Sequence, residues 1–118
     1  MSRDSVLKEK SLLVAIRIIN LFKYLRKQRQ EYIMSKQIIR AGTAIGASIR
    51  EAEYAESTRD FLHKLYISLK EANETIYWLD LLIATKFIEQ KMYDSLVCDV
   101  EEIMRMLIKS IKTLKARL

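Results

Sequence analysis

Apolar residues recur at steps of three and four along almost the whole chain, in four long stretches separated by short polar breaks. This period is typical of amphipathic helices, because residues three and four apart lie on the same helical face. Connections of a few residues make successive helices antiparallel neighbours. The pattern therefore predicts an all-α fold, an up-down-up-down antiparallel four-helix bundle that forms one domain over residues 1–118. The expected helices run from about Ser5 to Gln30, from Met34 or Ser35 to Glu56, from Ser57 to Lys86, and from Glu89 to near the C-terminus.

Each expected helix has one row of inward positions. In the first helix these are Leu7, Ser11, Val14, Ile18, Leu21 or Phe22, and Leu25. In the second they are Ile38, Ala41, Ile45, Ser48 and Ala52. In the third they are Leu65, Leu69, Ala72, Ile76, Leu79 and Ile83, and in the fourth Leu96, Val100, Ile103, Leu107, Ile111 and Leu114. Ser57 is the expected N-cap of the third helix, since its hydroxyl can accept a backbone N–H.

The third helix carries more apolar surface than the core of one short chain can cover. Apolar residues off its inward row are Phe61, Leu62, Tyr66, Ile67, Tyr77, Trp78 and Leu81. A helix that is hydrophobic nearly all round is buried nearly all round. We therefore expect a homo-oligomer whose subunit interface includes Phe61, Tyr66, Tyr77 and Trp78.

The composition supports long helices and excludes a membrane span. The 118 residues contain no proline and two glycines, and 31% of them are charged. No apolar run approaches the roughly 18 residues needed to cross a bilayer, so we expect no membrane partner. Cys98 is the single cysteine, and its apolar neighbours Leu96 and Val97 predict an inert thiol in the core. A cytoplasmic location fits this use of cysteine.

Gly42 and Gly46 lie one turn apart on the second helix. Each glycine inside a helix costs about 1 kcal/mol relative to alanine, so the pair needs a reason. Close approach of another backbone, where a side chain would not fit, is the interpretation we favour. A flexible site that a ligand approaches is the alternative.

The residues that could carry chemistry are too few for an active site. His63 is the single histidine, and with Asp60 it gives one Asp-x-x-His and no second copy. Di-iron bundles need such a pair, with glutamate, on each of two helices. No serine and orienting carboxylate are placed around His63 to make a hydrolytic triad. We therefore expect no metal, no cofactor, no catalytic residue and no enzymatic activity.

Charged residues in the middle of the second and third helices have two interpretations. They are Arg40, Arg50, Glu51, Lys70, Glu71 and Glu74. As solvated charges they form weak pairs on one helix, worth a few tenths of a kcal/mol. As ion pairs between helices or subunits they fix how the helices align. The sequence leaves both open.

Basic residues collect in two places, and the net charge is +6. The first cluster comprises Lys23, Arg26, Lys27 and Arg29. The second comprises Lys109, Lys112, Lys115 and Arg117, and in an antiparallel bundle it lies at the opposite end, near Arg3, Lys8 and Lys10. A basic surface of this kind predicts binding of RNA or DNA through phosphates, without strong sequence specificity. The alternative is a protein-binding adaptor or structural oligomer, in which these charges only complement helix dipoles.

Three segments together resemble a known family. They are SLLVAIRIINLFKYL from Ser11, QIIRAGTAIGASIREAEYA from Gln37 and DFLHKLYISLKEANETIYWLDLL from Asp60. They are similar to the small four-helix-bundle proteins encoded in intervening sequences of bacterial 23S ribosomal RNA genes. That family more often has serines and an asparagine where this chain has Ala41, Ala44 and Ser48, so no polar role is carried over to these positions.

The resemblance implies a homopentameric, barrel-like assembly of basic character. It also implies kinship with the accessory variability proteins of diversity-generating retroelements, which bind nucleic acid and a reverse transcriptase. A reverse transcriptase or another protein is therefore a further expected partner. The resemblance supplies no defined activity and no catalytic residue.

Overall fold

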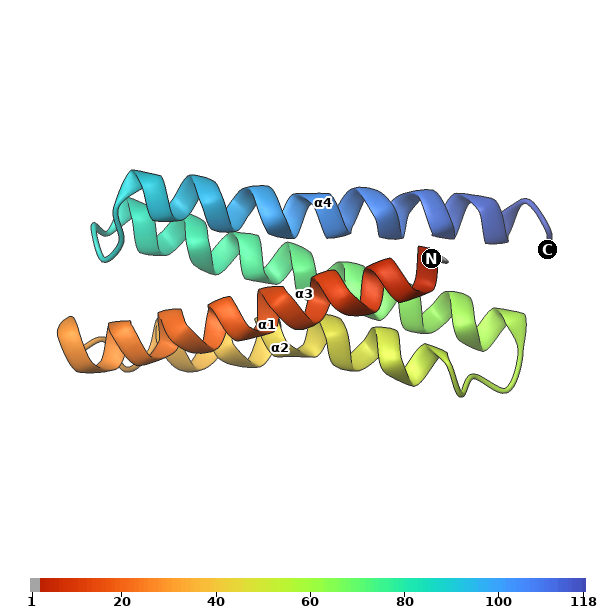
Figure 1. Cartoon of the computed structure of the whole chain (residues 1–118), viewed down its shortest axis with the longest axis horizontal. Helices are drawn as coiled ribbons and strands as arrows, with labels where there is room; N and C mark the ends of the chain where they lie inside the picture. Colours follow the sequence, from red (N-terminus) through yellow and green to blue (C-terminus); the bar gives the residue numbers. More distant parts are fainter. Residues whose placement is uncertain (1–2) are drawn as a thin grey trace.

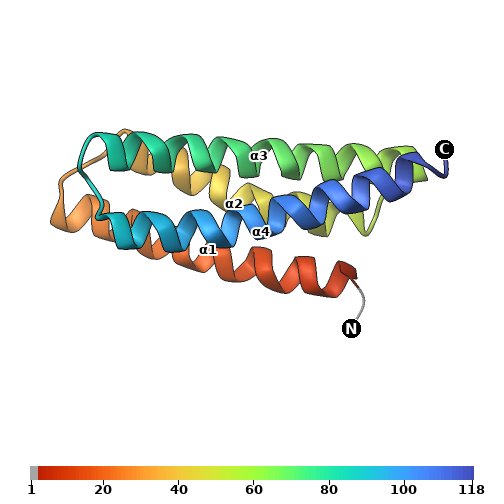
Figure 2. The same ribbon diagram turned by 90° about the horizontal axis from the view of Figure 1, so that it is seen from above.

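The computed structural model describes the backbone of residues 3–118 and the side chains from Val6 onward. Four helices run in turn up and down the long axis, which confirms the predicted all-α four-helix bundle (Figures 1 and 2). They are α1 (Arg3–Gln28), α2 (Met34–Ala52), α3 (Thr58–Ala84) and α4 (Gln90–Lys115). None of the described helices is both long enough and apolar enough to span a membrane.

The predicted inward rows of α1, α2 and α4 form the core. The positions predicted for α1 and α2 are buried. Of the two alternatives at one position of α1, Leu21 is buried and Phe22 is only half-buried. On α4 the buried row runs from Leu96 to Ile111, while Leu114 is half-buried. The helical period therefore located most of the core correctly.

The predicted inward row of α3 is partly wrong. Leu65, Ala72 and Leu79 are buried as expected, but Leu69, Ile76 and Ile83 are only half-buried. The other buried positions are Ser68, Thr75 and Leu82. A count of apolar residues overlooks the first two because they are polar. Their hydroxyls are satisfied, since Ser68 Oγ donates to the Ile45 carbonyl of α2 (2.8 Å) and Thr75 Oγ1 donates to the Glu71 carbonyl (2.8 Å).

The two glycines of α2 lie where α1 packs closely. A Cβ atom added at Gly42 would lie 2.8 Å from both Cγ1 and Cγ2 of Ile18, which is closer than carbon atoms approach. At Gly46 it would lie 3.1 Å from Ser11 Oγ. The predicted close packing against another helix is confirmed and explains why α2 accepts the cost of both glycines, but the atoms that lie closest are side-chain atoms of α1 rather than its backbone.

A buried carboxylate organises the turn between α1 and α2. The Glu31 side chain accepts backbone N–H groups from Ile33 (3.1 Å), Met34 (2.9 Å) and Ser35 (2.7 Å), all at the start of α2. The Ser35 hydroxyl donates back to the Glu31 carbonyl (2.9 Å). First-turn N–H groups have no partner within their own helix, and a carboxylate there also suits the helix dipole. Glu31 therefore caps α2 from outside the helix.

Other helix ends follow ordinary capping chemistry. The predicted Ser57 cap is confirmed, since Asp60 N–H donates to Ser57 Oγ (3.0 Å). The predicted end of α2 at Glu56 is wrong, because the helix ends at Ala52 and the next N–H groups bond three residues back. The chain leaves α3 at Lys86, two residues after the last helical residue Ala84, because Lys86 has a φ of 66°. The N–H of the next residue, Phe87, donates to the Leu82 carbonyl (2.9 Å), which satisfies an acceptor at the helix end.

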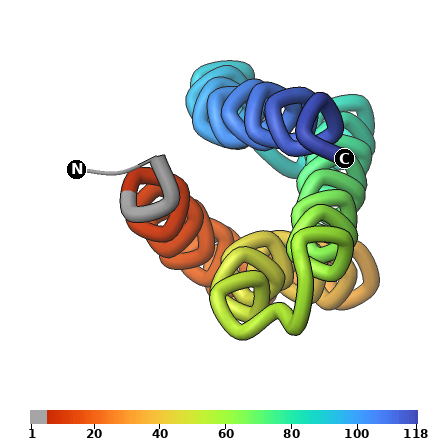
Figure 3. The backbone as a smooth tube through the Cα atoms, turned by 90° about the vertical axis from the view of Figure 1, so that its right-hand side faces the viewer, coloured from red at the N-terminus to blue at the C-terminus, as the bar shows by residue number. Residues whose placement is uncertain are grey.

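The seam between α1 and α4 is the loosest of the four seams in the bundle. Figure 3 shows these two helices inclined to each other rather than parallel. Ion pairs cross this seam between Lys10 and Glu102 and between Arg17 and Asp99 (2.7 Å). The hydrogen bond to Glu102 and its charge raise the pKa of Lys10.

The prediction that Cys98 is a core thiol is wrong. Its side chain is exposed on α4. Leu96 and Val100, two positions before and after it, are both buried. A displacement of two residues turns a helical side chain about 200° around the axis, so it points away from the core.

Candidate nucleic-acid interface

The two predicted basic clusters lie at opposite ends of the bundle, as expected. One occupies the last turns of α1 and the other the last turns of α4, and these helices end on opposite sides of Figure 1. Lys8 and Lys10 lie on the first turns of α1, at the same end as the second cluster. The side chain of Arg3 lies outside the described part of the chain.

Members of the α1 cluster differ in what they contact. Lys23 and Lys27 are exposed. The Arg26 guanidinium lies over two rings, 5.1 Å from the centre of Phe22 and 5.0 Å from the centre of Tyr32. Arg29 instead holds the turn between α3 and α4. Its Nη1 donates to the carbonyls of Phe87 (2.8 Å) and Lys86 (3.3 Å), and its guanidinium lies 5.2 Å from the Phe87 ring centre.

Three members of the α4 cluster, Lys109, Lys112 and Arg117, are exposed without a recorded side-chain contact in the described part of the chain. Lys115 is also exposed, but its Nζ donates to the Tyr66 hydroxyl (3.0 Å) and lies 5.7 Å from the centre of that ring. Tyr66 therefore joins the basic cluster to α3.

The ion pairs of the described side chains all involve basic residues outside these two clusters, although several other basic residues, such as Lys36 and Arg105, are also unpaired there. Acidic partners hold Lys8, Lys10, Arg17, Arg40 and Lys64. Among the side chains from Val6 to Leu118, no ion pair joins a member of either cluster to a carboxylate. The positive charge at the two ends is therefore not neutralised by the chain's own described acids.

The mid-helix charges pair between helices. Arg40 of α2 contacts both Glu71 (3.4 Å) and Glu74 of α3. Glu74 also accepts the Trp78 indole N–H (2.9 Å). Pairing across helices is therefore found for Arg40 with Glu71 and Glu74, and for Glu51 with Lys64 (3.7 Å). Arg50 and Lys70 are exposed and have no ion pair among the described side chains, as the other interpretation expected.

The four aromatic residues predicted for a subunit interface have different surroundings. Phe61 and Tyr66 are half-buried against the core, and Tyr66 contacts Lys115. Tyr77 is 54% exposed and meets half-buried Trp78 edge to face, with ring centres 5.1 Å apart. Within the chain, Tyr77 and Trp78 thus keep more outward surface than a core requires.

A second apolar surface lies on the outward face of α1, and the sequence reasoning missed it. Leu12, Leu13 and Ile16 are all exposed, Leu13 by 55%. They lie opposite the buried positions Val14 and Ile18 of the same helix. The signal was present in the sequence, because α1 is apolar on both faces at its middle. We call these three residues the α1 outer patch.

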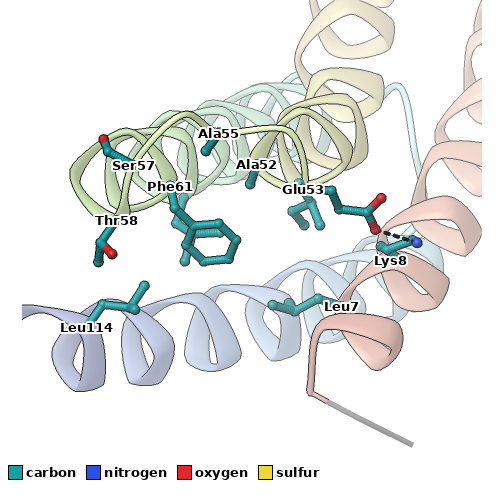
Figure 4. Close-up of a pocket in the computed structure, with 11 residues that line it drawn as sticks. Leu7, Lys8, Ala52, Glu53, Ala55, Ser57, Thr58, Phe61 and Leu114 are labelled. Carbon is teal, nitrogen blue, oxygen red and sulfur yellow. Dashed lines mark ion pairs between the residues drawn. The ribbon is translucent and has the colours of Figure 1, made fainter.

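A hollow of about 560 Å³ opens at the end of the bundle that holds both termini. Leu7, Phe61 and Leu114 face one another across it, and the Lys8–Glu53 ion pair lies at its side (Figure 4). The two charges in its lining neutralise each other, and the Ser57 hydroxyl at its rim is engaged as a helix cap. The hollow brings together no general base and nucleophile.

His63 also stands apart from any constellation, since it is exposed on α3. In the described part of the chain, no three His, Cys, Asp or Glu side chains gather closely enough to hold a metal ion.

The family comparison agrees with the helical pattern and the three quoted segments. Residues 3–109 match the family described as 23S rRNA-intervening sequence protein. The chain belongs to that family. No curated protein matches the chain.

Within the 23S rRNA-intervening sequence protein family, one solved structure is very similar. It is the 1.70 Å crystal structure of a protein of unknown function from the S23 ribosomal protein family of Bacteroides thetaiotaomicron VPI-5482. That protein is 55% identical, with a TM-score of 0.93, and the match covers 94% of this chain and 99% of the other. Neither description names an enzymatic activity.

Membership of this 23S rRNA-intervening sequence family identifies no binding residue. The functional features that sequence reasoning missed are the α1 outer patch and the stacked position of Arg26. The first could have been found from the second apolar face of α1. The stacked position of Arg26 depends on the conformation of the turn after α1, which brings Tyr32 close to Arg26. The spacing of residues in the sequence does not predict that conformation.

Proposed function

We propose that the protein is a non-enzymatic, self-assembling bundle that binds RNA or DNA phosphates through its two basic ends. The observation that carries this proposal is the charge that lacks an acidic partner among the described side chains. Lys23, Lys27, Lys109 and Lys112 are exposed and have no acidic partner among the described side chains, whereas Lys8, Lys10 and Lys64 each pair with a glutamate. Lysines that bind phosphates displace condensed counterions, which favours binding at low salt.

Self-assembly is the second part of the proposal. The α1 outer patch supports it, because large apolar side chains that cluster on a surface gain free energy when a partner covers them. Tyr77 and Trp78 on α3 offer further surface. A homopentamer, as the family resemblance implies, would repeat each basic cluster five times, and we propose that it acts in the cytoplasm. A ring of clusters would bind a polyanion more strongly than one cluster.

Salt dependence tests the phosphate part. We expect the protein to hold a labelled RNA hairpin and a DNA duplex at low salt and to lose both as salt rises. Lys109→Gln with Lys112→Gln should reduce the slope of log affinity against log salt by about two, since each lysine lost removes about one phosphate contact. Fluorescence anisotropy across a salt series measures this slope.

The matched control is Lys10→Gln with Lys64→Gln, which changes the net charge equally. Both lysines already have acidic partners, so the slope should stay near that of the unmodified protein. An equal fall in both double variants would show that only net charge matters. No retention of either probe at low salt would refute nucleic-acid binding and favour an adaptor role.

The mass in solution tests assembly. Light scattering at micromolar concentration should give a multiple of 13.9 kDa. Leu13→Asp should shift the mass toward the monomer, because a buried unpaired carboxylate is costly at an interface. Tyr54→Asp is the control, since Tyr54 is exposed on the connection after α2. A monomeric unmodified protein would contradict assembly, and an unaffected Leu13→Asp oligomer would exclude the α1 outer patch from the interface.

A further inference from the structure

We propose that the corner between α1 and α2 stacks the unpaired bases of a single-stranded nucleic acid, on a platform made by Phe22, Arg26 and Tyr32. This inference rests on the proposed function and adds to it the form of nucleic acid that one end prefers. The two ends of the bundle then differ in what they recognise. The corner binds bases and phosphates, and the end of α4 binds phosphates alone.

The platform is a stack that is already assembled within the chain. The Arg26 guanidinium lies 5.1 Å from the ring centre of Phe22, one turn earlier on α1, and 5.0 Å from that of Tyr32. Both distances are within the range of cation–π contact. Arg26 and Phe22 are half-buried, whereas Tyr32 is 49% exposed. The Arg26 guanidinium therefore contacts both rings, and of the three side chains Tyr32 is the one most exposed to solvent.

The backbone around Tyr32 is held firmly. Gln30 has a φ of 50°, and Glu31 N–H donates to the Leu25 carbonyl (2.9 Å). The next residue after Tyr32, Ile33, donates its N–H to the buried Glu31 carboxylate. Tyr32 thus projects from a fixed turn between two anchored residues. An aromatic side chain held in place loses less entropy when a base stacks on it.

Charge is placed beside this platform. Lys23 and Lys27 are exposed on α1 and lie three residues before and one residue after Arg26. Sites for single strands combine aromatic side chains, on which bases stack, with a positive surface that follows the phosphates. In a duplex the base faces already stack on one another, so only unpaired bases can use the ring. Every base has a flat face, so the preference is for strand form rather than sequence.

The end of α4 offers a less accessible ring. Lys115 Nζ lies 5.7 Å from the centre of the Tyr66 ring and donates to its hydroxyl, but Tyr66 is half-buried, whereas Tyr32 is 49% exposed. Its lysines Lys109 and Lys112 have no ring recorded beneath them. This contrast is what assigns base stacking to the corner.

Fluorescence anisotropy on the full chain tests the inference with four labelled probes of about 20 nucleotides, long enough to cover one such site. They are oligo-dT, oligo-rU, an abasic DNA strand with the same number of phosphates, and a DNA duplex. Oligo-dT should bind about tenfold more tightly than the abasic strand, because stacking one base on an aromatic side chain changes the affinity by about this factor. Similar affinity for oligo-rU and oligo-dT would show that the corner accepts both RNA and DNA, and a large difference would identify the one it prefers.

Variants assign the preference to the platform. Tyr32→Ala should lose the tenfold preference while its affinity for the abasic strand stays unchanged. Tyr32→Phe should keep the preference, because it keeps the ring. Tyr54→Ala is the matched control, since it removes another exposed tyrosine from the other end of α2. Circular dichroism confirms that each variant is folded.

Two results would overturn the inference while leaving the proposed function intact. One is equal affinity of the unmodified protein for the abasic and ordinary strands. The other is a Tyr32→Ala variant that keeps the base preference. Failure to bind any of the four probes at low salt would overturn both the inference and the proposed function.

Discussion

Glu31→Ala is expected to lower the free energy of unfolding by about 2–3 kcal/mol. Hydrogen bonds to a charged group contribute about this much to stability, and their loss leaves backbone N–H groups without an acceptor. Glu31 is 7% exposed, and its carboxylate accepts three N–H groups at the start of α2. Removal leaves these N–H groups without their acceptor, and the Ser35 N–H is buried away from water. Chemical denaturation followed by circular dichroism measures the change.

Two controls separate capping from a general effect of lost charge. Glu31→Gln keeps one acceptor oxygen and should cost about half as much, since the bond to a neutral acceptor is weaker. Glu53→Ala removes an exposed glutamate beside the other end of α2, where it pairs with Lys8. An exposed ion pair contributes at most about 1 kcal/mol, so this variant should be nearly as stable as the unmodified protein. Equal losses for Glu31→Ala and Glu53→Ala would refute the capping role.

Gly42→Ala is expected to destabilise the bundle by about 2 kcal/mol, although alanine is the better helix former. The new methyl group would lie 2.8 Å from two carbon atoms of Ile18, so α1 and α2 must move apart. Such a shift disturbs the tightest part of their packing. Thermal and denaturant unfolding of the purified variant give the magnitude.

Gly46→Ala is the matched control on the same helix. Its methyl group would meet the Ser11 hydroxyl at 3.1 Å, which is a milder conflict. The gain in helix propensity of about 1 kcal/mol should offset it, leaving stability nearly unchanged. In the Gly42→Ala, Ile18→Ala double variant the two losses should not add, because the clashing Cγ atoms are gone. Additive losses would show that the clash is not the cause.

The helical period predicted the fold because each helix buries one face against its neighbours. It located core positions such as Ile18, Ile45 and Ile103, and glycine spacing located the close approach of α1 and α2. It failed on α3, where apolar residues occur nearly all round the helix and two of the buried positions are polar. Ser68 and Thr75 are buried because carbonyl oxygens accept their hydroxyl protons.

The candidate interface was predicted less completely than the fold. The positions of the two basic clusters followed from antiparallel topology, but the contacts of individual side chains did not. Arg29 and Lys27 look equivalent in the sequence. Arg29 is engaged by the turn after α3, whereas Lys27 remains exposed. Arg29 is engaged because it contacts a segment nearly 60 residues away in the chain. No local sequence pattern predicts such a contact.

The loose seam between α1 and α4 makes ionic strength a conformational variable for this molecule. The screening length falls from about 10 Å at 0.1 M salt to about 3 Å at 1 M, which weakens exposed ion pairs. The pairs of Lys10 with Glu102 and Arg17 with Asp99 are of this exposed kind. Ion pairs also join α2 and α3, but these two helices are in much more extensive contact, including buried side chains. High salt should therefore speed amide hydrogen exchange along this seam before it affects the α2–α3 contact. Salt then weakens the contact between the first and last helices, α1 and α4, as well as the binding of a polyanion.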